Sequence, residues 1–159
     1  LNMEEEKYAD YAPFILRLAA YIIDSAIIGT AGGILFAIFG GMSLLSSGIL
    51  TNPESLTDEH ILAIALSFAG YGLFMFIGQW LYFALMESSK MRGTIGKNLL
   101  GLEVSDLDGR RITFLRATGR YFAKIISAMI MYIGFLMAAF TERKQALHDM
   151  MSNCLVLKI

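Results

Sequence analysis

Arg17 and Asp24 are the residues best suited to chemistry, because they are the only charges in the apolar segment 14–39. Seven residues make almost two helical turns, so at about 100° per residue the two side chains project from nearly the same face. Asp24 would then lie roughly 10 Å deeper in a membrane than Arg17. A charge at that depth costs about 2.5 to 3.5 kcal/mol and marks a functional site by default. Asp24 is therefore predicted to bind a proton or a cation, with Arg17 favouring its ionised form; the alternative is an Asp24 that only joins helices by hydrogen bonds.

The composition is that of a membrane protein. Of the 159 residues, 56% are hydrophobic and 17% are charged, and the mean hydropathy is +0.58. Soluble proteins are about 45–50% apolar and about 25% charged, so the chain is predicted to be a small all-α integral membrane protein. Its length fits a single domain, residues 1–159.

Enzymatic chemistry is not expected, because no nucleophile–base pair, metal set or cofactor fingerprint is visible. The single Cys154 excludes an intrachain disulfide, and together with His60 and His148 it matches no zinc-site spacing. We therefore expect no catalytic residue, no metal, no cofactor and no nucleic-acid partner.

Two segments are predicted to cross the membrane as helices, residues 14–39 and residues 61–86. About 20 apolar residues span the hydrocarbon of a bilayer, and the second segment contains no charge at all. The loop between them, residues 40–60, carries three acidic residues and no Lys or Arg. The N-terminal residues are acidic where a signal peptide would be basic, so the first helix is expected to stay uncleaved.

Small residues recur at every fourth position of the first segment. Such a ladder lets a second helix approach closely, so we predict that it packs helices together and does not line a pore. Its members are Ser25, Gly29, Gly33, Ala37 and Gly41. In the second segment, Gln79 lies at a depth similar to that of Asp24; it either bonds to that carboxylate or lies near the headgroups.

The segment after the second helix is basic, with eight Lys or Arg residues between positions 87 and 124. Cytoplasmic loops carry such an excess, which predicts a multi-pass protein of the plasma or inner membrane with a cytoplasmic N-terminus and basic loop. Within residues 87–114, apolar residues alternate along 100–105, and a turn sequence follows at 106–109. This pattern predicts a small cytoplasmic β-hairpin.

Residues 115–140 are predicted to form an amphipathic helix that leads into a hydrophobic one. Arg116, Arg120 and Lys124 recur every four residues, so their face is expected to contact anionic lipid headgroups. The sixteen uncharged residues that follow, 125–140, make about 24 Å of helix. They either cross the membrane or turn back at Gly134.

The charges of the tail, residues 141–159, bear on whether segment 125–140 crosses the membrane or turns back. Arg143, Lys144 and Lys158 favour the cytoplasmic side, and hence a re-entrant segment. The strand-like end of the tail, residues 154–157, is predicted to join the sheet that begins in the basic loop.

Three stretches of the chain, taken together, resemble the RDD family of membrane proteins, which is named for one arginine and two aspartates. They are RLAAYIID at 17–24, TIGKNLLGLEV at 94–104 and ALHDMMSNCLV at 146–156. The resemblance covers nearly the whole chain. Ile95 replaces the usual proline, and Ser152-Asn153 replaces the usual Gly-Thr pair.

This resemblance implies that Arg17, Asp24 and Asp149 form a functional trio, and that the chain is similar to members that support sodium–proton exchange. We hypothesise that Arg17 and Asp149 pair at the cytoplasmic mouth, which would fold the tail back. Gln79, Lys97 and Arg143 are the candidate residues around the trio.

Two functions follow from these patterns. The first is a small transporter of a proton, a monovalent cation or a solute, and a homo-oligomer, because two or three helices leave little interior for a pathway. The alternative is a non-catalytic scaffold or accessory subunit that docks into a larger membrane complex through its ladder of small residues.

Overall fold

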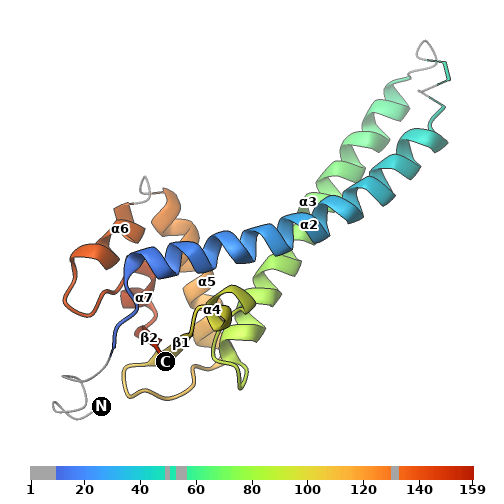
Figure 1. Ribbon diagram of the computed structural model, residues 1–159. Helices are drawn as coiled ribbons and strands as arrows, with labels where there is room; N and C mark the ends of the chain where they lie inside the picture. The colour runs from blue at the N-terminus through green and yellow to red at the C-terminus, as the bar shows by residue number, and fades with distance from the viewer. Residues whose placement is uncertain (1–9, 49–50, 53–56, 130–132) are drawn as a thin grey trace. The chain divides into compact units, whose positions relative to one another are not determined.

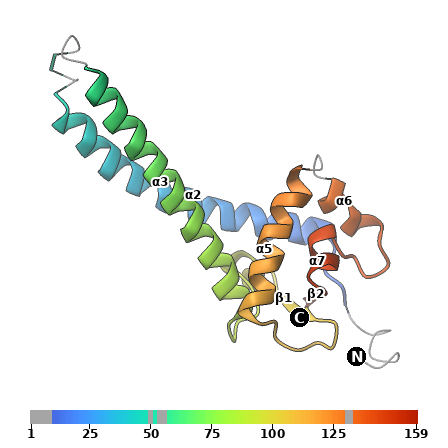
Figure 2. The same ribbon diagram turned by 180° about the vertical axis from the view of Figure 1, so that it is seen from behind.

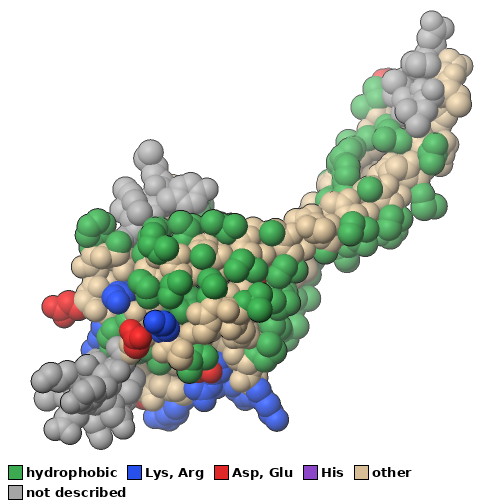
Figure 3. Space-filling model, viewed as in Figure 1, with side chains coloured by type: hydrophobic (Ala, Val, Ile, Leu, Met, Phe, Trp, Pro, Cys, Tyr) green, Lys and Arg blue, Asp and Glu red, His purple; other side chains and the backbone are tan. Residues whose placement is uncertain are grey.

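The computed structural model describes residues 10–48, 51–52, 57–129 and 133–159. It contains two long apolar helices, α2 (Phe14–Ser46) and α3 (Asp58–Ser88), and a small antiparallel sheet (Figure 1). Both helices are long and apolar enough to cross a membrane, which confirms that the two predicted segments are long apolar helices. Hydrophobic side chains cover much of their visible surface, and Lys and Arg gather at the lower edge of the view in Figure 3.

Both helices are longer than predicted. The Gly and Ser residues after position 39 were expected to start a loop, but α2 continues to Ser46. Near its end, the hydroxyls of Ser46 and Ser47 donate to the carbonyls of Ser43 and Leu44, so these polar groups are satisfied within the helix. At the start of α3, Thr57 Oγ1 accepts from the backbone N–H of His60, as an N-cap residue does.

The chain forms two compact units, residues 1–25 with 80–159 and residues 26–79. In the second unit α2 and α3 pack together around Gly32. The hydroxyl of Tyr71 donates to the Gly32 carbonyl at 2.7 Å, and the Phe36 ring lies 5.6 Å from the Phe68 ring. A Cβ at Gly32 would come within 2.4 Å of Met75 Cε. Gly32 is thus a contact point between α2 and α3, although the flexible end of Met75 could move aside for a larger residue.

The predicted ladder does not form this contact among the described residues, and its role in packing α2 against another helix stays a prediction. Ser25, Gly29, Gly33 and Ala37 are exposed and Gly41 is half-buried. A Cβ added at Gly29, Gly33 or Gly41 would meet no described atom within 4 Å. Helix α2 meets α3 on the face that contains Gly32, and the ladder lies on a different face of α2.

The first unit is organised around a two-stranded sheet. Strand β1 (Leu102–Asp106) pairs antiparallel with β2 (Cys154–Lys158), with Val104 opposite Val156. Alternation places Leu102, Val104 and Val156 in the core, where each is almost fully buried. The chain before α2 extends this sheet, because the Ala12 N–H donates to the Val156 carbonyl at 2.9 Å.

The C-terminal strand therefore joins the sheet as predicted, but the predicted hairpin is wrong. A turn does form at 106–109, and Ser105 and Arg111 make an isolated bridge. No second strand follows, because Thr113 accepts from the backbone N–H of Arg116 and caps the next helix, α5 (Phe114–Met129). The partner of β1 comes instead from the other end of the chain.

The predicted helix 115–140 is divided. Helix α5 ends at Met129, residues 130–132 lie outside the described ones, and α6 (Ile133–Phe140), which contains Gly134, is only about 12 Å long. Helices α5, α6 and α7 (Leu147–Met151) pack against one another, as both ribbon views show (Figures 1 and 2). By itself α6 is too short to cross a bilayer.

Candidate functional site

Arg17 and Asp149 form an ion pair between the first turns of α2 and α7. Arg17 Nη1 donates to Asp149 Oδ2 at 2.5 Å, and Arg17 Nε donates to the Ala12 carbonyl at 3.1 Å. The same carboxylate accepts from the Ala146 N–H at 3.1 Å, which fixes the start of α7. The tail is thus folded back onto the entrance of α2.

Arg120 joins this pair to a second carboxylate. Its Nε and Nη2 donate to Asp149 Oδ1 at 2.9 and 2.6 Å, and its Nη1 donates to Glu87 Oε2 at 2.8 Å. Glu87 Oε1 also accepts from Lys97 Nζ at 2.6 Å and from Lys124 Nζ at 3.3 Å. We call these six residues the charge network: Arg17, Glu87, Lys97, Arg120, Lys124 and Asp149.

The prediction that Arg120 faces lipid headgroups is wrong. Its side chain is only 2% exposed, and it bridges two carboxylates that are equally buried. Lys124 also turns inward, toward Glu87, whereas Arg116 stays exposed. The three basic residues do share one face of α5, as their spacing predicts. Helices α3 and α7 cover this face at Arg120 and Lys124, and they supply the counter-charges Glu87 and Asp149.

Burial and the neighbouring charges shift the pKa of Asp149 in opposite directions. Burial alone would raise the pKa of Asp149, but the attraction of Arg120 and the other nearby cations outweighs it and holds the pKa well below its usual range. Burial likewise would lower the pKa of Arg120, yet Asp149 and Glu87 raise it. This part of the charge network stays ionised at any physiological pH.

Lys97 and His148 behave differently. Burial, reinforced by the charge of Arg120, lowers the pKa of Lys97 to about 7, although Glu87 partly opposes the shift. Burial lowers the pKa of His148 to about 3, so this imidazole is neutral at pH 7. Lys97 is therefore a group of the charge network that exchanges its proton near neutral pH.

Asp24 lies in a separate site that joins three helices. Its Oδ1 accepts from the Tyr82 hydroxyl and from the Gly96 N–H, both at 2.8 Å, and its Oδ2 accepts from Thr94 Oγ1 at 2.5 Å. Asp24 is only 1% exposed. It therefore holds the start of the short helix α4 (Ile95–Leu99) against α2 and α3.

Gly96 makes this contact possible. A Cβ at position 96 would lie 2.3 Å from the Ala20 carbonyl oxygen and 3.0 Å from the Asp24 carboxylate. Only glycine brings its N–H this close to the α2 backbone.

Helix α4 connects the two sites. Thr94 caps α4 by accepting from the Lys97 N–H at 3.4 Å, while Lys97 Nζ reaches Glu87. The trio is thus not one cluster: Arg17 contacts Asp149 directly, whereas Asp24, further along the same helix α2, binds partners on α3 and α4. Gln79 belongs to the other unit and makes none of the hydrogen bonds described for Asp24. Arg143 is exposed.

Sequence reasoning missed Tyr82, Glu87 and Thr94, and it missed the inward roles of Arg120 and Lys124. One signal was available. Glu87 is a carboxylate at the end of an uncharged helix and directly precedes a segment rich in Lys and Arg, as expected for a shared counter-ion.

The chemistry open to the Asp24 site is that of a carboxylate with two hydroxyls. These oxygens can hold a proton or a small hard cation. Among the described residues, no three His, Cys, Asp or Glu side chains gather as a metal site would require. The oxygen groups around the Asp24 carboxylate in the described site are therefore the hydroxyls of Tyr82 and Thr94.

Comparison with known proteins agrees with this architecture. The model of the RDD family matches residues 11–153. The chain is also 37% identical, over 147 residues, to the uncharacterized protein YxaI of Bacillus subtilis (strain 168), covering 92% of this chain and 96% of that protein. No solved structure matches. With its two apolar helices and a family match over most of its length, this chain belongs to the RDD family of membrane proteins.

Proposed function

We propose that this chain carries protons or monovalent cations across the membrane, with Asp24 as the binding group. The observation that carries the proposal is a fully buried carboxylate within a helix long and apolar enough to cross a bilayer. Ionisable groups in such positions are expensive, and they mark proton relays and ion pathways.

The partners of Asp24 suit repeated loading and unloading. Tyr82 and Thr94 donate through hydroxyls, which can rotate and accept instead when the carboxylate gains a proton or a cation. The Gly96 N–H can only donate, so it keeps the carboxylate in place. Lys97, on the same short helix as Thr94, supplies a second group that titrates near neutral pH.

Replacing Asp24 with asparagine should abolish cation-driven proton flux in proteoliposomes, because an amide keeps the shape of the carboxylate but binds no proton. A fluorescent pH dye inside the vesicles reports the flux.

Replacing Lys97 with glutamine should remove the dependence of this flux on pH around 7, because glutamine keeps a donor to Glu87 but cannot titrate. The same pH dye, read at a series of external pH values, measures the result.

The matched control is Asp108→Asn, which removes an exposed carboxylate that pairs with Arg110 on the turn, away from the Asp24 site. Its flux should equal that of the unchanged protein. If Asp24→Asn remained folded and transported as well as Asp108→Asn, Asp24 would be structural and the proposal would fail.

We further propose that the N-terminus, the basic loop and the tail face the cytoplasm. The excess of Lys and Arg supports this orientation. The ion pair of Arg17 with Asp149 and the β1–β2 pairing place the tail beside the basic loop, which favours a segment 125–140 that turns back.

A reporter fused after Ile159 should therefore be active if it requires the cytoplasm and inactive if it requires the far side of the membrane. The same reporters inserted at Asn52 of the full chain provide the control, with the opposite result expected. A tail reporter active only on the far side would contradict this topology.

A second function, that of a scaffold or accessory subunit in a membrane complex, is favoured by one observation. The ladder of small residues is exposed on α2, so its backbone is open to a helix from another chain. In the flux assay, a protein that transports nothing under any gradient and co-purifies with a membrane partner would support this alternative.

A further inference from the structure

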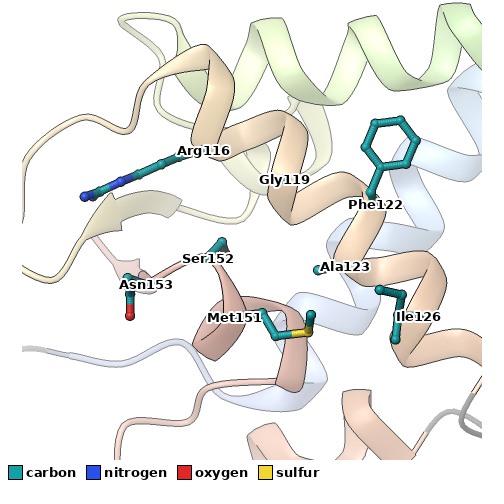
Figure 4. A pocket seen from close by; sticks show the side chains of 8 residues that line it. All are labelled: Arg116, Gly119, Phe122, Ala123, Ile126, Met151, Ser152 and Asn153. Carbon is teal, nitrogen blue, oxygen red and sulfur yellow. The ribbon is translucent and has the colours of Figure 1, made fainter.

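A cavity of about 380 Å³ lies between α5 and the residues at the end of α7, outside both sites described above. Ligand pockets in proteins have volumes of about 300 to 1,000 Å³. Figure 4 shows that its lining is divided: Arg116 and Asn153 lie at one end, and Phe122, Ile126 and Met151 lie toward the other. A ligand that fits must be anionic or polar at one end and apolar at the other.

The polar end of the cavity can receive an anion. The Arg116 side chain is 48% exposed, and its ion pair with Asp106 is long, at 3.7 Å. Such a surface pair contributes little, so the guanidinium can exchange its partner. Asn153 is exposed beside it and carries two amide donors. The Ser152 hydroxyl donates to the His148 carbonyl at 2.6 Å, so the donors left for a ligand are those of Arg116 and Asn153.

The apolar end continues into a surface that suits the membrane. Large apolar side chains of α5 are exposed next to the cavity, among them Phe122, Ile126 and Met129, and Met151 of α7 is exposed across from them. Exposed apolar side chains gathered in this way suit the acyl part of a bilayer.

We propose that this cavity binds one anionic phospholipid of the surrounding bilayer. The phosphate lies at Arg116 and Asn153, and the first part of an acyl chain lies along Phe122, Ile126 and Met151. A helix of a protein partner, about 10–12 Å across, is too wide for this volume. A soluble phosphate would leave the apolar wall uncovered. The proposal is independent of ion transport, because the cavity shares no residue with the Asp24 site or the charge network.

Gly119 provides a way to close the cavity without removing a charge. It lines the cavity, and a Cβ added there would meet no described atom within 4 Å. Leucine at this position can therefore extend into the space, and leucine is a better helix former than glycine. Gly119→Leu should fold and fill the ligand position.

The test uses the full chain in a mild detergent, to which phosphatidylglycerol or phosphatidylcholine is added, and native mass spectrometry counts the retained lipid. We expect one phosphatidylglycerol to be held in preference to phosphatidylcholine. Arg116→Gln should weaken its retention about tenfold, as expected for the loss of a charge-assisted contact. Gly119→Leu should abolish the retention.

Arg110→Gln is the matched control, since it removes an equal charge from an exposed side chain on the turn and should change nothing. Equal retention of both lipids, or retention that survives Arg116→Gln and Gly119→Leu, would overturn the proposal. So would displacement of the lipid by millimolar inorganic phosphate, because the occupant would then be a soluble anion.

Discussion

Replacing Arg120 with methionine should destabilise the folded protein by about 3 to 5 kcal/mol, the range for breaking a buried ion pair from one side. The guanidinium donates three hydrogen bonds to two carboxylates that are at most 1% exposed. Methionine keeps the length of the side chain but leaves Asp149 and Glu87 without their shared partner. Unfolding in detergent, followed by circular dichroism against added denaturant, measures the loss.

Two variants make this result specific. Arg120→Lys keeps the charge but cannot reach both carboxylates in one plane, so its stability should lie between those of the unchanged protein and Arg120→Met. Arg110→Met removes an exposed arginine, with a side chain 75% exposed, and should change stability by less than about 0.5 kcal/mol. An Arg120→Met protein as stable as Arg110→Met would show that the charge network does not hold the fold.

Replacing Gly96 with alanine should cost about 3 kcal/mol, the sum expected from a backbone clash and weakened hydrogen bonds to a carboxylate. The added Cβ would lie 2.3 Å from the carbonyl oxygen of Ala20, and backbone cannot move aside as a flexible side chain can. Helix α4 would have to retreat from α2, so Asp24 would lose the donors of Gly96 and Thr94. Trypsin reports this retreat, because Lys97 is only 7% exposed in the intact site.

Gly119→Ala is the matched control for this effect. It also changes a helical glycine to alanine, but the Cβ meets open space, so stability should rise by up to about 1 kcal/mol. Cleavage after Lys97 should be fast in Gly96→Ala and unchanged in Gly119→Ala. If both variants resisted trypsin equally, the close approach of α4 and α2 would not matter to the fold.

The long helices and the C-terminal strand could be predicted because their signals are local. Segments 14–39 and 61–86 are apolar over more than a membrane thickness, and alternation along 100–105 and 154–157 indicates strands. The hairpin prediction failed because it assumed that β1 pairs with its nearest neighbour. Which strand pairs with β1 depends on the fold of the whole chain, since β2 lies about fifty residues further on.

The charge network could be predicted only in part. Arg17 stands out as one of the two charges in segment 14–39, Asp149 follows from the family resemblance, and their ion pair is a hypothesis of the sequence analysis. Arg120 was assigned to the lipid because helical spacing reveals a common face but not what covers it. Glu87 lies at the boundary between an apolar helix and a basic segment, where charged side chains are usually exposed to solvent. Only tertiary packing distinguishes a solvated charge from a buried one.

The contact between α2 and α3 at Gly32 is not the one that the ladder of small residues indicates. A regular ladder is a visible signal, whereas Gly32 is one glycine among several in the same helix. Tyr71 and Met75 of α3 lie opposite Gly32. Helical periodicity by itself does not show which face of α2 meets these side chains.

The ion pair of Arg17 with Asp149 sets the order in which this protein can mature. The two residues are 132 positions apart, so at about 5–20 residues per second the ribosome takes about 7 to 26 seconds to supply the second after the first. During that interval the entrance of α2 carries a cation whose counter-ion does not yet exist. The ion pair that ties the tail to the start of α2 is therefore among the last contacts that the growing chain can form.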